Sequence, residues 1–293
     1  MKHLPTSPID FLKTNILARF ENTNPGFAKY VHQLISDGTI QRTICYYYDQ
    51  ECVKTPFVSN DGYIHLQSTF LSFLWIHCYY TLVIHEEVSV KHFDKKTPSQ
   101  QNIFNNELIN KTIEFQQYAM SLVRFHSEWD LRVYPGPNTP DKSGKDYHIM
   151  ANQLFLYAVD YVMCHEFAHL ELKHFTSSKP RIDLEKEADK RAYELMLSGV
   201  TSENKVGMET GILIALCSLL FLSHSISGGG SHPDKHERIK EYLETINPPA
   251  ESHLWSIACM LIGVWENKFS LNIGFPSHVA DHKEMFYNLY PKL

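Results

Sequence analysis

Residues 164–175, CHEFAHLELKHF, place three histidines and two glutamates in one short stretch. Among them His165, Glu166 and His169 form the pattern H-E-x-x-H. Residues four apart lie about 40° from each other around an α-helix, so both imidazoles can reach one metal ion. Glu166 lies about 100° from the first histidine, where its carboxylate can take a proton from a water on the metal. These residue types at this spacing predict a hydrolytic zinc site.

The pattern carries this meaning only on a helix, and the surrounding sequence predicts one near 148–174. Residues 157–163, which precede the motif, are mostly apolar and contain no proline or glycine. On one continuous helix, Glu171 and His174 would lie about 160° and 140° from the second histidine of the motif. Neither is therefore predicted to bind the metal.

A catalytic zinc ion usually takes three protein ligands and a water, so a third ligand is needed. Residues 182–189, IDLEKEAD, predict the start of a second helix with Asp183 as its N-cap. Glu185 and Asp189 are four apart and share a face, whereas Glu187 points away from it. One of the two can bind the ion while the other accepts a hydrogen bond from the back of a ligand imidazole. The alternative is a solvated helix stabilised by charge pairs four residues apart.

A third element follows the glycine run at 228–230. Residues 231–239, SHPDKHERI, predict another helix start, in which Pro233 suits the first turn. His232 and Arg238 could direct cationic or hydrogen-bonding groups at the oxyanion of a hydrolytic transition state. The alternative is a capped surface helix whose charges are incidental.

The rest of the chain predicts the elements that position these residues. β-branched and aromatic residues predict a strand at 40–48, and Ser-Asn-Asp-Gly at 59–62 predicts a hairpin turn between two further strands. A loop rich in proline and glycine is predicted at 133–146, ahead of the first motif. Helices are also expected near 67–87, 103–127, 183–198, 205–225, 233–246 and 252–268.

The predicted fold class is α+β and predominantly α-helical, with a small antiparallel sheet in the N-terminal third. No strong boundary divides the chain, so the sequence predicts a single metallopeptidase domain over residues 1–293. Within it we expect a strand and helix region up to about residue 145 and a helical zinc-site region from about 146.

Composition favours a cytoplasmic protein. The 293 residues carry a net charge of −6, which argues against nucleic acid as the main partner because phosphate binding needs a basic surface. The first residues, MKHLPTSPIDFL, hold no apolar stretch of the length of a secretory signal. The apolar segments 70–84 and 211–222 are shorter than the ~20 residues of a membrane span and predict core helices. Six cysteines without a CxxC pair indicate free thiols.

The ordered set HEFAH, EKEAD and HPDKHERI resembles the gluzincin metallopeptidases of the HtpX and CAAX-prenyl-protease kind. The resemblance implies a zincin-like (gluzincin) catalytic core with one zinc ion and three ligands, His165, His169 and Glu185. It further implies that Glu166 is the general base and that Asp189 supports a ligand from behind. His232 is implied in transition-state stabilisation, with Arg238 supporting the site.

Those enzymes are membrane proteins, and over its whole length the chain is more similar to the soluble phage-exclusion peptidase family typified by the Lit protease. The similarity extends to chain length and to the aromatic segment LSFLWIHCYY after an N-terminal strand. It implies a cytoplasmic bacterial zinc endopeptidase of antiviral defence. Infection, through a phage-derived activator, would trigger cleavage of the host elongation factor Tu.

Two other classes of function compete with this prediction. One is a non-catalytic zinc-binding regulator or toxin-like sensor, against which the presence of Glu166 argues. The other is a zinc hydrolase of a small molecule. An edge strand and an open cleft beside the metal would favour a peptide substrate, since an extended peptide binds by adding a strand to a sheet.

Overall fold

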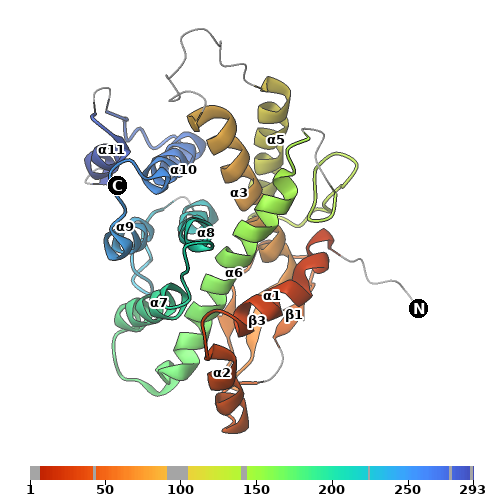
Figure 1. Ribbon diagram of the computed structural model, residues 1–293, viewed down its shortest axis with the longest axis vertical. Coiled ribbons are helices and arrows are strands. Elements are labelled where there is room, and N and C mark those ends of the chain that lie inside the picture. The colour runs from red at the N-terminus through yellow and green to blue at the C-terminus, as the bar shows by residue number, and fades with distance from the viewer. Residues whose placement is uncertain are drawn as a thin grey trace.

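The computed structural model describes residues 7–41, 44–90, 105–139, 144–223, 225–276, 279–290 and 293 (Figure 1). The long helices in chain order are α1 (Lys13–Glu21), α2 (Phe27–Ser36), α3 (Ser68–Ile84), α5 (Asn106–Leu122), α6 (Tyr147–Glu171), α7 (Arg181–Leu197), α8 (Lys205–Ser218), α9 (Lys235–Ile246), α10 (His253–Phe269) and α11 (His282–Leu289). Short 3-10 or π-helical turns are η1 (Pro8–Leu12), η2 (His85–Val90), η3 (His174–Thr176) and η4 (Leu219–Leu222). The protein is therefore mostly helical, as predicted.

Every helix that the sequence predicts from residue 67 onward is present, but several ends differ. The π-helical turn η2 continues α3, and η4 continues α8. The helix expected near 148–174 ends at Glu171, and the one expected near 103–127 ends at Leu122. Residues 103–104, residue 224 and part of the predicted loop, 140–143, lie outside the described residues. The sequence did not predict α11.

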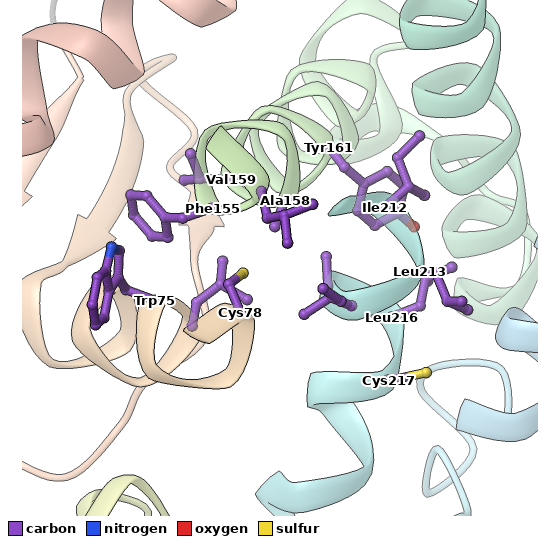
Figure 2. Packing of buried hydrophobic residues seen from close by; sticks show 14 of the residues in the cluster. Trp75, Cys78, Phe155, Ala158, Val159, Tyr161, Ile212, Leu213, Leu216 and Cys217 are labelled. Atoms are coloured by element: carbon purple, nitrogen blue, oxygen red, sulfur yellow. The ribbon is translucent and has the colours of Figure 1, made fainter. Parts of the chain in front are cut away.

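Helix α6 crosses the molecule, with the sheet and α1 on one side and α7 and α8 on the other (Figure 1). It packs against α3 and α8 through apolar side chains, as Figure 2 shows for Phe155, Ala158 and Tyr161 of α6. A Cβ atom on Gly211 would lie 2.5 Å from the Cβ of Tyr157, so this glycine allows α8 to approach α6 closely.

The two apolar segments are core helices. Nearly every side chain of α3 is buried. Among the described residues one helix, Lys205–Leu222, is long and apolar enough to cross a membrane by length and composition, and 67% of it is buried within the protein. All six cysteines are free thiols, as predicted.

The sheet has three strands in the order β1-β3-β2. Strand β2 (Phe57–Val58) pairs antiparallel with β3 (Ile64–Gln67) through the predicted turn, where Gly62 takes a φ of 88°. Strand β1 (Cys45–Tyr47) pairs parallel with the other side of β3, so the sheet is mixed and the prediction of an antiparallel sheet is wrong. Strand β2 runs in the opposite direction to both β1 and β3, so β1 and β3 point the same way. The predicted strand residues 42–43 lie outside the described residues.

The strand order determines which edge of the sheet lies next to α6. Because β3 occupies the middle, β2 pairs with a strand on one side only within the described parts of the chain. Helix α6 packs against β2. A free strand edge therefore borders the helix that carries the H-E-x-x-H pattern.

Candidate metal centre

Three side chains from two helices converge at one point. His165 and His169 lie one turn apart on α6, with their Nε2 atoms 3.3 Å apart. Glu185, on α7, brings its carboxylate oxygens to 3.4 Å from Nε2 of His165 and 3.8 Å from Nε2 of His169. One donor atom from each lies within 4.8 Å of the other two, and no other such group of histidine, cysteine or acidic side chains occurs in the described part of the chain.

This spacing fits a small metal ion. Ligand bonds of about 2.0–2.1 Å in a tetrahedral arrangement place the ligand atoms about 3.3–3.4 Å apart. The two imidazole nitrogens and the pair formed by His165 Nε2 and Glu185 Oε2 match that value, while His169 Nε2 is 3.8 Å from the other oxygen of Glu185. Two imidazole nitrogens and a carboxylate oxygen are donors that a catalytic zinc site uses, which leaves a fourth position for water.

The turn between the two helices sets the position of Glu185. Helix α7 begins at Arg181 and not at Asp183, so the predicted N-cap is wrong. Pro180 precedes the helix, and its carbonyl accepts the backbone N–H of Asp183 and of Leu184. Glu185 therefore lies on the second turn, and Ala188, wholly buried, allows α6 and α7 to pack closely.

Asp189 lies behind His165, one turn of α7 after Glu185. Its Oδ1 is 2.8 Å from His165 Nδ1 and accepts the hydroxyl of Tyr161 at 2.7 Å. Arg238 of α9 donates its Nε to Oδ2 at 2.7 Å and its Nη2 to Oδ1 at 2.6 Å. Burial would raise the pKa of Asp189, but Arg238 and His165 outweigh burial and hold it well below its usual value. The carboxylate is thus charged and can fix the proton of His165 on Nδ1.

Glu166 follows His165 on α6 and lines the same cleft as Val58 of β2. Burial is the main cause that raises the pKa of Glu166 to about 7, with the charge of Glu185 adding to it and that of His165 opposing it. A carboxylate with a pKa near neutrality is suited to accept and return a proton.

His232 reaches the same place from the glycine-rich loop. Its Nε2 is 3.6 Å from Oε1 of Glu185, and 43% of its side chain is exposed. Its Nδ1 lies 2.9 Å from Oγ of Ser231. A Cβ atom on Gly228 would lie 1.9 Å from the carbonyl oxygen of His232, so only glycine fits there.

The helix after this loop starts later than the sequence predicts. Asp234 is its N-cap residue and Lys235 its first residue, so Pro233 precedes the helix instead of opening it. The side chain of Asp234 accepts the backbone N–H of Gly228 and thereby closes the loop. Arg238, one turn into α9, is directed at Asp189, so it supports the centre from behind.

A cleft of about 760 Å³ runs along these residues. Its lining includes Phe57 and Val58 of β2, Leu184 of α7, and Gly228 and His232 of the glycine-rich loop. The apolar part of its lining is formed by Phe70, Val162, Ala215, Leu219 and Leu222. Its cationic side chains are Lys179, Arg181, Lys235 and Arg238. The cleft is thus bordered by a strand edge and lined largely by apolar groups.

Sequence reasoning missed the position of His174. The prediction assumed that α6 continues past residue 174, but the helix ends at Glu171 and Lys173 takes a left-handed φ of 55°. The chain therefore turns back, and His174 Nδ1 comes to 2.8 Å from His169 Nδ1. Glu171, in contrast, accepts hydrogen bonds from Tyr30 and Arg191 and takes no part in the triad.

The fold and the site together define a helical protein with a candidate metal centre in a cleft beside a strand edge. Residues 64–258, more than half of the chain, match the family model described as Peptidase U49. The chain belongs to this family, which supports a peptidase function. No curated protein and no solved structure matches the chain.

Proposed function

We propose that this peptidase is a zinc-dependent endopeptidase of the gluzincin type. The observation that supports it most is that β2, an edge strand of the described sheet, lines the same cleft as Glu166 and the candidate ligands. An extended peptide can add to such an edge as a further strand, with its backbone hydrogen-bonded to the protein. A small-molecule hydrolase has no need of this edge, so the geometry favours a protein substrate.

In this proposal His165, His169 and Glu185 hold one zinc ion. When bound there, zinc supplies a Lewis acid that polarises the scissile carbonyl and makes a coordinated water more acidic. Glu166 takes a proton from the attacking water and later gives a proton to the leaving amine. His232 lines the same cleft next to Glu185, where its imidazole can donate to the oxyanion as the carbonyl becomes tetrahedral.

Two groups keep these residues in place during the reaction. Asp189 holds His165 in the tautomer whose Nε2 lone pair faces the centre. Arg238 keeps Asp189 charged and oriented through two hydrogen bonds. The apolar lining of the cleft excludes water around a bound peptide and accepts its side chains.

For the biological setting we propose a cytoplasmic enzyme of antiviral defence that acts on a host translation factor, elongation factor Tu, after activation by a phage-derived component. This part rests on the similarity to Lit-type peptidases. The three motifs that carry the similarity lie within the matched residues 64–258.

The test compares phage-infected cells that express the wild type with phage-infected cells that express Glu166→Gln, followed by labelling of new protein N-termini. The amide has the size of the carboxylate but cannot accept the proton, so cut ends should appear only with the wild type. Zinc content measured on both purified proteins should be one ion per chain. If the variant produces the same cut ends, Glu166 is not the general base; cut ends outside elongation factor Tu would change the substrate and leave the peptidase assignment intact.

A further inference from the structure

His174 lies directly behind the second candidate ligand. Its Nδ1 is 2.8 Å from Nδ1 of His169, and the two rings meet edge to face with centroids 4.9 Å apart. His174 is only 7% exposed, although it stands in the short turn between α6 and α7. The left-handed conformation of Lys173 brings it there. A buried histidine placed by a special backbone conformation invites a functional explanation.

The geometry excludes His174 as a fourth ligand. Its Nδ1 faces His169, and its Nε2 faces Oε2 of Glu187 at 3.6 Å. Neither nitrogen is directed at the point where the three ligand atoms converge, and the group of possible metal ligands comprises only His165, His169 and Glu185. His174 must therefore act on the centre through His169.

The proton positions follow from these contacts. His169 presents Nε2 to the other two donor atoms, so this nitrogen needs a free lone pair and the proton sits on Nδ1. That N–H needs an acceptor, and the nearest is Nδ1 of His174. His174 then carries its own proton on Nε2, and the nearest carboxylate oxygen is Oε2 of Glu187 at 3.6 Å, beyond hydrogen-bond distance. The contact that defines the pair is therefore the one between the two Nδ1 atoms.

Glu187 is itself held from the other side. Lys179, in the turn before α7, binds its second carboxylate oxygen. Glu187 is two residues before Asp189 on α7, so the same helix supplies the carboxylates behind both ligand histidines. Asp189 contacts His165 directly, whereas Glu187 reaches His169 through His174.

We propose that His174 is a positioning residue that fixes the tautomer and ring orientation of His169 for metal binding, with the charge of Glu187 near its other nitrogen. The inference rests on the proposed zinc centre and deepens it. Partners of this kind, behind a ligand histidine, change metal affinity about 10–100-fold when they are removed.

The experiment measures zinc affinity by competition with a chromophoric chelator, together with urea unfolding of the metal-free protein. His174→Leu fills the space but removes the acceptor, and its zinc dissociation constant should rise about 10–100-fold. His174→Asn carries an acceptor oxygen where Nδ1 stood and should recover most of that loss. Glu187→Gln should give a smaller loss than His174→Leu, because His174 keeps its contact with His169.

A matched control is offered by His148, which is also buried and lies at the start of α6, far from the centre. His148→Leu should leave the zinc dissociation constant unchanged. Wild-type zinc affinity in His174→Leu, or equal losses in the leucine and asparagine variants, would overturn the positioning role. If the wild type binds no zinc, the proposed function falls and the inference falls with it; zinc binding that His174→Leu leaves intact overturns the inference alone.

Discussion

Replacing Asp189 by alanine should do two separable kinds of damage, one to the fold and one to the metal centre. Asp189 and Arg238 are 2% and 8% exposed and share two hydrogen bonds. Removing one partner of such a buried ion pair costs about 3–5 kcal/mol, because the other charge stays buried without compensation. That is a large part of the ~5–15 kcal/mol by which most domains are stable.

The second loss concerns His165. Without Asp189 its Nδ1–H has no acceptor, so the dissociation constant for zinc should rise about 10–100-fold. The two effects can be separated with the double variant Asp189→Leu, Arg238→Met. It removes both charges, and replacing a buried ion pair by apolar residues is often neutral for stability. The free energy of unfolding should then return to within about 1 kcal/mol of the wild-type value. The remaining loss comes from the Tyr161 hydroxyl, which also loses its acceptor.

Zinc affinity should not return in the double variant, because His165 still lacks its partner. The assays are urea unfolding of the metal-free proteins and chelator competition for zinc. Asp183→Ala on the same helix removes an exposed carboxylate and is the control, with an expected cost below about 1 kcal/mol. A double variant with wild-type zinc affinity would show that Asp189 acts only through the fold. If Asp189→Ala lowers the free energy of unfolding by less than about 1 kcal/mol, the argument from the buried ion pair is refuted.

Three further substitutions test other residues of the same site. Glu185→Ala should lose most zinc affinity because it removes one of three ligands, and a variant that keeps full affinity would exclude Glu185 from the ligand set. His232→Ala should lower kcat about 10²–10³-fold while leaving zinc content unchanged, and unaltered turnover would make His232 a surface residue. Gly228→Ala places a methyl group against the carbonyl of His232 and should lower kcat while the zinc dissociation constant stays constant.

The helical elements could be predicted because their signals are local. An apolar run without proline or glycine, such as 157–163, defines a helix wherever it packs. The relation between Glu185 and Asp189 was likewise open to prediction, since residues four apart share a helix face. Which of the two meets the ligand atoms depends on how α7 packs on α6, and the sequence left this choice open.

Contacts between residues far apart in the sequence, and the backbone conformation of a single residue, could not be predicted from local sequence patterns. The parallel pairing of β1 with β3 depends on the path of the chain between them, which no turn motif encodes. The end of α6 depends on Lys173, a residue with no special preference for a left-handed φ. The contact of His174 with His169 follows from that one residue. The pairing of Arg238 with Asp189 likewise joins helices far apart in the sequence.

The two ligand histidines are held with unequal strength. His165 donates to a charged carboxylate that Arg238 fixes in the core, and hydrogen bonds to charged groups contribute about 1.5–3 kcal/mol. His169 pairs with a neutral imidazole in a turn, where about 0.5–1.5 kcal/mol is typical. The carboxylate behind that turn, Glu187, is partly exposed and screened by water. The hydrogen bond behind His165 is therefore the stronger of the two.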